Sequence, residues 1–313
     1  MKRAIPWVFL VACQRTGIPE GSFPDRETAV TRHTSGESGQ DKDPCLSRDG
    51  KLLFFSSTAW SRHHDIYAKA LGGNVLTRIT SSPSEERFPQ PNPKQPETIA
   101  FCSDVNGEWD IFVIEDYLRE PSKWIRVSEE GGDDIHPSWS PDGTRLVYSS
   151  SSDGGISWHL KVRDLISGRT LVLENVDGLL PEWNPKDDRI VFQRMRHRDQ
   201  WFGSIWTLEL DQDTVRNLTA IYGGETWAAI NPSWSPDGEH LVFATVARSR
   251  VREGIFGEAD DLWVIGADGS NPVRITSDPA ADWMPAWSYN GEVFFVSRRS
   301  GRSAIWSLRP RLP

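Results

Sequence analysis

The sequence contains no apolar run of the ~18 residues that a membrane-spanning helix needs, and it lacks the short motifs of several enzyme classes. It has no GxSxG elbow of a serine hydrolase, and neither an HExxH nor a CxxC pair that would indicate a zinc or redox site. Its 7 histidines are scattered along the chain. We therefore expect a protein that is not an enzyme and that binds no cofactor or metal.

The sequence also has fewer basic than acidic residues. It contains 35 Lys and Arg and 44 Asp and Glu, which gives a formal net charge of −9. Nucleic-acid binding generally needs a basic surface, so we expect no nucleic-acid partner. Cysteine is rare, with 3 residues. We expect Cys45 and Cys102 to be two separate buried thiols, although an oxidising compartment would permit a disulfide between them.

A repeat runs through most of the chain. The phrase IHPSWSPDG at residues 135–143 returns as INPSWSPDG at 230–238. Aligned on one proline, six copies follow one another at steps of 45, 48, 44, 51 and 53 residues. A period of this size indicates a fold built from repeated units. The motif prolines are Pro44, Pro89, Pro137, Pro181, Pro232 and Pro285.

Each copy carries the signals of short β-strands. In the third copy, RLVYSS and HLKVRD follow the motif, and the other copies have equivalent stretches. Alternation with a period of two, in residues that are β-branched or aromatic, is typical of half-buried strands. A further short stretch before a threonine or serine, such as VLTRIT at residues 75–80, completes four strands per copy. We name these strands a to d in order.

Turns and tryptophans fix how the copies assemble. Asp142-Gly143 and Asp237-Gly238 predict tight a–b hairpin turns with positive φ, and a proline precedes each pair. Four copies have a tryptophan two positions after the motif proline, suited to packing between neighbouring sheets. A four-stranded sheet cannot bury both of its faces alone. The sequence therefore predicts an all-β fold, a six-bladed β-propeller of four-stranded antiparallel blades.

The two ends of the chain are expected to close this ring. The sixth copy has strands a, b and c, after which the sequence stops. The segment AVTRHT at residues 29–34 is similar in character to strand d of the first copy. We expect it to complete the last blade, which would remove an open strand edge.

The repeated WSPDG motif is similar to that of the TolB-type propellers of bacterial envelopes. The resemblance covers roughly residues 26–313, and it does not include the N-terminal domain of TolB. It implies a six-bladed propeller and a role in binding within the cell envelope. A fold of this kind does not by itself specify a function.

The first residues resemble a bacterial lipoprotein signal. Lys2 and Arg3 precede a short apolar region, and LVAC at residues 10–13 is similar to a lipobox. We expect residues 1–12 to be a signal peptide, Cys13 to be lipidated, residues 13–25 to be a tether and 26–313 to be the propeller. Acyl chains would then attach the protein to a membrane. Because Gln14 rather than Asp follows Cys13, we expect the outer membrane, facing the periplasm.

Carboxylates stand three positions before the motif proline in four copies. In a propeller these d–a positions share one end of the central channel, so they predict an acidic rim for a cation or a basic peptide. The alternative is that each carboxylate caps its own loop. His136 lies at the same rim. The four residues are Asp41, Glu86, Asp134 and Asp282.

The b–c loops, at the same end of the channel, are richer in arginine and tryptophan. Arg196 and Trp201 lie in the loop of the fourth copy, and Arg250 lies in the long insertion of the fifth. Trp227 and Trp283 fall near this end as well. Exposed Trp and Arg dominate recognition sites, although the tryptophans could equally be packing residues.

These patterns favour a lipid-anchored, non-catalytic binding or scaffold module of the envelope. The expected partner is an envelope protein, a peptide or a peptidoglycan-associated component, docked on the loop-rich face over the channel. The alternative is a hydrolase or lyase that acts on a saccharide within the channel.

Overall fold

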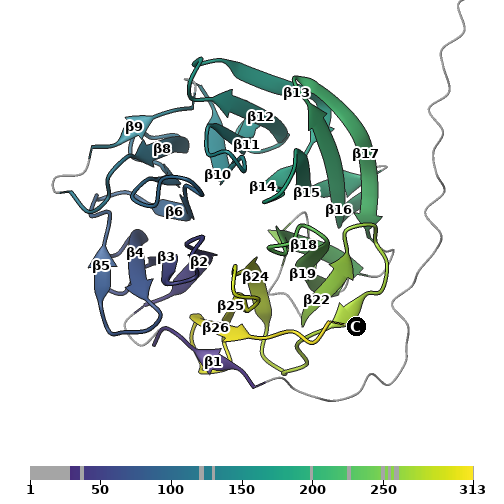
Figure 1. Ribbon diagram of the computed structural model, residues 1–313. Helices are drawn as coiled ribbons and strands as arrows, with labels where there is room; N and C mark the ends of the chain where they lie inside the picture. Colours follow the sequence, from purple (N-terminus) through teal and green to yellow (C-terminus); the bar gives the residue numbers. More distant parts are fainter. Residues whose placement is uncertain are drawn as a thin grey trace, which may run out of the picture.

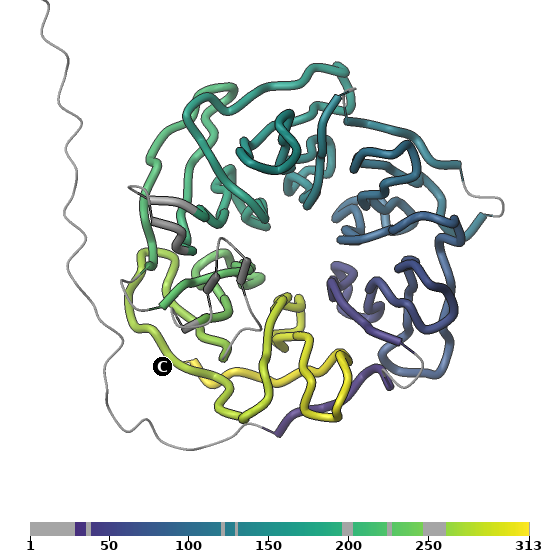
Figure 2. Tube along the Cα trace, turned by 180° about the vertical axis from the view of Figure 1, so that it is seen from behind, coloured from purple at the N-terminus to yellow at the C-terminus, as the bar shows by residue number. Residues whose placement is uncertain are grey.

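A computed structural model describes residues 29–35, 39–119, 123–128, 131–197, 200–223, 227–247, 251–252, 255–256 and 261–312. All regular elements of these residues are β-strands. Six four-stranded antiparallel sheets are arranged around a central opening (Figures 1 and 2). Strands β2, β6, β10, β14, β18 and β24 lie innermost (Figure 1). The predicted six-bladed propeller is therefore confirmed.

The first three blades follow the order of the chain, from the innermost strand outward. They are β2 (Asp41–Leu46), β3 (Leu52–Ser57), β4 (Asp65–Ala70) and β5 (Leu76–Arg78); β6 (Glu86–Pro91), β7 (Ile99–Ser103), β8 (Asp110–Ile114) and β9 (Ile125–Arg126); and β10 (Asp133–Trp139), β11 (Arg145–Ser151), β12 (His159–Asp164) and β13 (Thr170–Asp177).

The fourth and fifth blades are larger, and a two-stranded hairpin is inserted in the fifth. They are β14 (Leu179–Trp183), β15 (Arg189–His197), β16 (Gln200–Asp211) and β17 (Thr214–Tyr222); and β18 (Trp227–Trp234), β19 (His240–Ala247), β22 (Asp261–Gly266) and β23 (Val273–Arg274), with β20 (Val251–Arg252) and β21 (Ile255–Phe256) between β19 and β22.

The sixth blade joins the two ends of the described chain. It consists of β24 (Asp282–Trp287), β25 (Val293–Ser297), β26 (Ala304–Leu308) and, at its outer edge, β1 (Thr31–Arg32). Thr31 pairs with Ser307, and Arg32 pairs with Trp306. The prediction that the segment 29–34 closes the ring is confirmed.

The hydrophobic core lies between neighbouring blades. Strands β7, β8 and β25 are buried along their whole length, because both faces of each sheet are covered by the next one. One core cluster, for example, joins Phe54 and Ile66 of the first blade to Phe101 and Phe112 of the second. The tryptophan of the repeat packs as expected between blades, and it is at most 9% exposed at Trp139, Trp183, Trp234 and Trp287.

The a–b turns are built by side chains of the motif itself. Ser140 Oγ donates a hydrogen bond to Asp142 Oδ1 over 2.5 Å, and the N–H of Thr144 donates to the same oxygen. Gly143 has φ = 73°, whereas Asp142 is not in the left-handed region. The turn therefore needs positive φ only at its glycine, which corrects the expectation for both residues of the Asp-Gly pair.

The two cysteines of the propeller do not form a disulfide. Cys45 and Cys102 are both free thiols, as expected, although Cys45 is only half-buried. Among the described residues no helix is long and apolar enough to cross a membrane.

Candidate functional site

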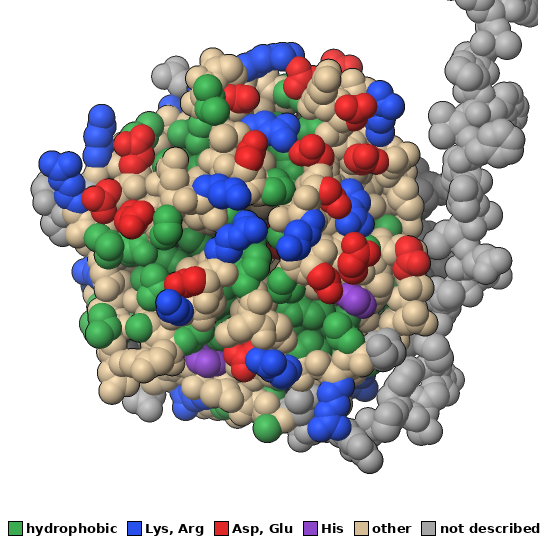
Figure 3. All heavy atoms as spheres, in the orientation of Figure 1, with side chains coloured by type: hydrophobic (Ala, Val, Ile, Leu, Met, Phe, Trp, Pro, Cys, Tyr) green, Lys and Arg blue, Asp and Glu red, His purple; other side chains and the backbone are tan. Residues whose placement is uncertain are grey.

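The central channel contains a hollow of about 190 Å³, lined by the innermost strand of every blade and by the a–b turns that follow it. It extends from the residue before the motif proline towards the turn, so it lies in the half of the channel away from the b–c loops. Figure 3 shows lysine and arginine side chains gathering around the central depression of one face. Among the described residues, the lining of the hollow comes from the repeat motif and its turns.

The residue before the motif proline has positive φ in all six blades. At the same position the pairing of the two inner strands shifts register, as at Lys42/Cys45 and Ile135/Ser138. Such a β-bulge bends the strand and re-aims its side chains. All six of these residues line the hollow. They are Asp43, Phe88, His136, Leu180, Asn231 and Met284, with φ between 50° and 57°.

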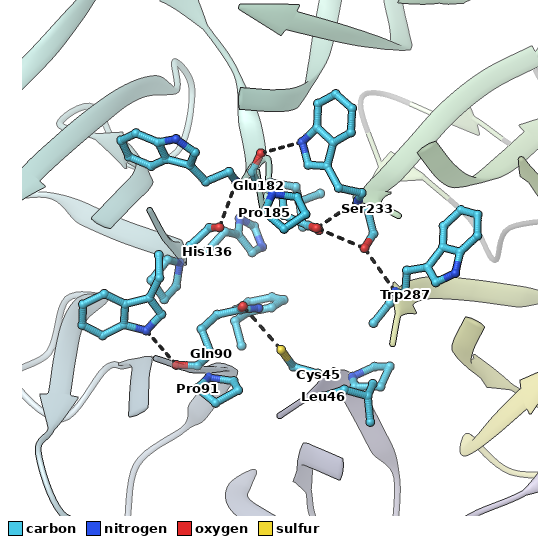
Figure 4. A pocket seen from close by; sticks show the side chains of 18 of the residues that line it. Cys45, Leu46, Gln90, Pro91, His136, Glu182, Pro185, Ser233 and Trp287 are labelled. Atoms are coloured by element: carbon cyan, nitrogen blue, oxygen red, sulfur yellow. Dashed lines mark hydrogen bonds between the residues drawn. The ribbon is translucent and has the colours of Figure 1, made fainter. Parts of the chain in front are cut away.

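The residue after the motif proline forms a second layer, in which side chains link one blade to the next. Ser138 Oγ accepts a hydrogen bond from the N–H of Trp183 over 3.0 Å, and Ser233 Oγ accepts one from Trp287. These bonds hold the inner strands together around the channel (Figure 4). The layer consists of Cys45, Gln90, Ser138, Glu182, Ser233 and Ala286.

Glu182 is the carboxylate of this layer. Its Oε1 accepts hydrogen bonds from the N–H of Trp234 over 2.9 Å and from Ser233 Oγ over 3.2 Å. Burial raises the pKa of Glu182 to about 7, against the lowering effect of these two donors. Figure 4 shows Glu182 beside Ser233, facing the opening from the fourth blade.

A collar of prolines forms the end of the hollow at the a–b turns. Pro93, Pro141, Pro185 and Pro236 are half-buried there, whereas the first and sixth blades place Arg48 and Tyr289 at the same position. The guanidinium of Arg48 lies 5.3 Å from the ring centroid of Tyr289, within the range of a cation–π contact. Tyr289 is 37% exposed. The collar is thus largely apolar, with one cation.

Side chains of the turns connect the collar around part of the ring. Asn92 Nδ2 donates to the carbonyl of Gly143 over 2.9 Å, and Asn184 Nδ2 donates to that of Gly238 over 3.1 Å. These bonds tie the second blade to the third and the fourth to the fifth. We call them the Asn–Gly clips.

A buried ion pair lies between the first and second blades. Arg87 Nη2 is 2.9 Å from Asp43 Oδ1, and Arg87 Nε contacts the other oxygen. Burial alone would raise the pKa of Asp43, but Arg87 and Ser56 hold it below its ordinary value. His136 packs edge-on against Phe88 with 4.1 Å between ring centroids. Burial lowers the pKa of His136 to about 3, so the imidazole is neutral at pH 7.

The predicted acidic rim is not exposed. Each of its four carboxylates points at a serine of strand b, which is its partner in the β-ladder. Ser57 Oγ donates to Asp41 over 2.6 Å and Ser103 Oγ donates to Glu86 over 3.2 Å. The expectation of a carboxylate ring open to a cation or peptide is therefore wrong, because Asp41, Glu86, Asp134 and Asp282 are at most 4% exposed.

Arginine side chains lie beside the rim residues of the sixth blade. Arg299 Nη2 lies 2.9 Å from Asp282, which neutralises the carboxylate of the sixth blade. Arg298 lies over Trp283, 5.9 Å from its ring centroid. In the sixth blade the rim carboxylate is thus paired within the fold.

Of the predicted site residues whose side chains the structure describes, His136 alone lines the hollow. Trp227 and Trp283 are half-buried, and Trp283 packs against the hydrophobic core. Arg196 and Trp201 pair across β15 and β16, but their side chains lie outside the described part. Cys13 and Arg250 lie outside the described residues altogether.

Sequence reasoning missed three lining residues, Arg48, Glu182 and Tyr289. Arg48 and Tyr289 occupy a repeat position where the other copies have proline, and Glu182 occupies one where no other copy has a charged residue. The six-fold alignment contains this signal, since a departure from the motif on an inner strand marks a different lining residue. No group of three or more His, Cys, Asp or Glu that could hold a metal ion occurs among the described residues.

Several solved propellers are similar to this chain in fold. A structure described as TolB from Agrobacterium tumefaciens superposes with a TM-score of 0.65 at 17% identity, covering 88% of this chain and 91% of that one. Oligogalacturonate lyase from Vibrio parahaemolyticus superposes with a TM-score of 0.60 at 16% identity, covering 92% and 95%. At such identities the likeness concerns the fold alone.

Sequence relatives give the family. The Tol-Pal system protein TolB of Anaeromyxobacter dehalogenans is 33% identical over 133 residues, which is 42% of this chain and 27% of that protein. The TolB of Francisella tularensis is 27% identical over 209 residues, 66% of this chain and 46% of that protein. The matches thus span less than half the length of either relative. The TolB beta propeller domain profile matches residues 22–226, and the chain belongs to this family.

Proposed function

We propose that this propeller is a non-catalytic binding module of the bacterial cell envelope that docks a protein or peptide over its central channel. Membership of the TolB beta propeller family supports the envelope role. One structural observation supports the docking site, namely the hollow to which all six blades contribute. Ligand sites are usually concave, mostly apolar and equipped with few polar groups.

The collar is the part of the channel best suited to receive a partner segment. Its prolines are rigid and their rings are half-buried, so a partner orders few side chains on docking. Tyr289 and Arg48 are of the residue types that carry much of the binding energy at interfaces. We therefore place the docking site at the a–b turns, whereas the sequence alone favoured the loop-rich face.

Capture of the partner from detergent-solubilised envelopes tests this assignment. Arg48→Ala with Tyr289→Ala should weaken capture at least tenfold, because the exposed cation and its aromatic support are lost. Arg196→Ala with Arg250→Ala, in the b–c loops, is the matched pair on the other face and should leave capture unchanged. If the second pair abolishes capture and the first pair does not, the docking site lies on the loop-rich face.

The saccharide-active alternative has no specific observation in its favour. The lyase neighbours share the fold at 15–16% identity, and about half of the residues that line the hollow are prolines and tryptophans.

We also propose that Cys13 anchors the protein in the envelope, in the outer membrane facing the periplasm. The basic, then apolar segment before Cys13 supports this proposal. Cys13→Ser should release the protein from the membrane fraction or leave an unprocessed precursor. Membrane association that persists after signal cleavage would contradict it.

A further inference from the structure

We propose that Glu182 is a recognition group inside the channel, and that it takes one organic cation, the side chain of a lysine or arginine of the docked partner. This inference rests on the proposed function, since it names the chemistry that the docked segment must carry. It concerns a carboxylate in the wall of the hollow, in the layer directly after the motif prolines.

Only one oxygen of Glu182 is used by the fold. Oε1 accepts the hydrogen bonds from Ser233 and Trp234, which fix the orientation of the carboxylate. Oε2 has no partner among the described residues, and Glu182 lines the hollow. A fixed carboxylate with one free oxygen is preorganised to accept a charge-assisted hydrogen bond from an ammonium or guanidinium.

The other groups around the hollow that could be anionic are already paired or neutral. Asp43 is paired with Arg87 at 2.9 Å, and His136 is neutral. Burial raises the pKa of the Cys45 thiol to about 12 and raises that of Tyr289, with Glu182 contributing to both from across the channel. Neither group is charged at pH 7. Arg48 lies over Tyr289 at the collar.

Two arginines stand near the tryptophans beside Glu182, but both have carboxylate partners. Arg145 lies over Trp183 and pairs with Asp188 at 2.9 Å. Arg189 lies over Trp234 and pairs with Asp187 at 2.8 Å. Glu182 is therefore the lining carboxylate that has no cation among the described residues.

The depth of Glu182 fits a long basic side chain. Glu182 lies in β14 (Leu179–Trp183), and the collar residue Pro185 lies in the turn that follows this strand, so Glu182 stands behind the collar in the hollow. Lys and Arg carry an apolar stem below a charged head. The prolines of the collar suit the stem, and Glu182 suits the head. A backbone held at the collar could thus place one cation beside Oε2.

A cation beside Glu182 would favour its ionised form. Since burial raises the pKa of Glu182 to about 7, part of the carboxyl population is protonated at neutral pH. A cationic ligand must then displace a proton, so it should bind more tightly as pH rises. Between pH 6 and pH 8 the ionised fraction increases about tenfold, and the affinity should increase by about the same factor.

The experiment is a titration of the whole protein with n-butylammonium chloride, followed by carboxyl NMR of a sample labelled with ¹³C-glutamate. The Glu182 signal should move saturably, its pKa should fall, and binding should be about tenfold tighter at pH 8 than at pH 6. n-Butanol, which has the same stem and no charge, should leave the signal unmoved. These titrations use the wild-type protein. An equal response to n-butanol, or no saturable response to the ammonium, would overturn the inference.

Two variants localise the effect. Glu182→Gln keeps an acceptor for Ser233 and Trp234 and should abolish ammonium binding. Glu97→Gln removes an exposed carboxylate from an a–b turn of the second blade and should leave it unchanged. If Glu182→Gln binds the ammonium like wild type, the cation site is elsewhere. If the wild-type protein does not bind the ammonium, while the Arg48 and Tyr289 variants still lose the partner, this inference is rejected and the docking proposal stays intact.

Discussion

His33 is a half-buried base at the point where the ring closes. Its Nε2 lies 2.8 Å from Ser307 Oγ of β26, and its ring packs on Phe294 with 4.7 Å between centroids. The ammonium of Lys69 reaches the carbonyl of His33. Burial, with Lys69 adding to it, lowers the pKa of His33 to about 4. The closure is therefore built around a neutral imidazole.

This neutrality makes stability depend on pH. Because the folded pKa lies below the unfolded value of about 6.5, the unfolded chain binds more protons between pH 6.5 and 4, and stability falls as the pH drops through this range. Between pH 7 and pH 5 the wild-type protein should lose on the order of 1–2 kcal/mol of unfolding free energy through His33, and the His33→Gln variant should lack this loss. Urea unfolding of both proteins at the two pH values measures it, and identical slopes would show that His33 does not contribute.

The positions of the acidic residues could be predicted from the sequence, but their surroundings could not. The six-fold alignment correctly placed Asp41 and Asp282 at one end of the inner strands. Whether such a carboxylate faces the channel or strand b depends on its ladder partner, here Ser57 and Ser297. The register of the two strands determines that partner, and a bulge at the next residues changes this register. For the same reason the half-buried state of Glu182 could not be predicted from the sequence.

Among the elements, the a–b turns have a packing constraint at their glycines. A Cβ added at Gly143 would lie 2.5 Å from Asn92 Oδ1, and one at Gly238 would lie 2.6 Å from Asn184 Oδ1. These asparagines also form the Asn–Gly clips. A side chain at either glycine would therefore separate two neighbouring blades as well as strain its own backbone.

Gly143→Ala should destabilise the protein by roughly 2–4 kcal/mol, of which about 1–2 comes from the left-handed backbone and the rest from the displaced Asn92. Gly291→Ala is the matched control, since Gly291 has φ = 85° and nothing within 4 Å of an added Cβ. It should lose only the backbone part. Chemical denaturation of the two variants compares them, and equal losses would mean that the clip adds no stability.

The strands themselves were largely predictable, because alternation and turn residues act locally. The third copy illustrates this, with RLVYSS and HLKVRD appearing as β11 and β12. The positive φ before each motif proline was not predicted. A residue before proline usually favours an extended conformation, and only the pairing of two strands around a narrow channel imposes the left-handed one.

At the scale of the whole molecule, closure depends on the N-terminal segment. A protein that begins at residue 29 should melt like wild type, whereas one that begins at residue 35 loses β1 and should melt several degrees lower. The loss exposes the edge of β26 and removes the bonds from Ile305 to the 33–34 region, including Ile305 N–H to Thr34 Oγ1 over 2.9 Å. Calorimetry on the two truncations decides, and coincident transitions would show that β1 is dispensable.

The architecture as a whole could be predicted because strand and turn signals that are weak in one copy become clear when all six copies are aligned. The second copy, FPQPNPKQ, would not identify a blade by itself. The location of the hollow could not be predicted, because it results from side-chain volumes that meet only when the ring has formed.

The short length of strand β1 also affects how the propeller would respond to force. Any pull on the chain before Val30 reaches the propeller through Thr31 and Arg32, which hold to β26 by two residue pairs. Under such a load this short pairing is the first to be stressed, ahead of the long pairing of β15 with β16. Tension applied from the N-terminal side would thus act on the seam of the ring while the other five blades stay paired, so the closure is the point at which a tethered propeller would yield.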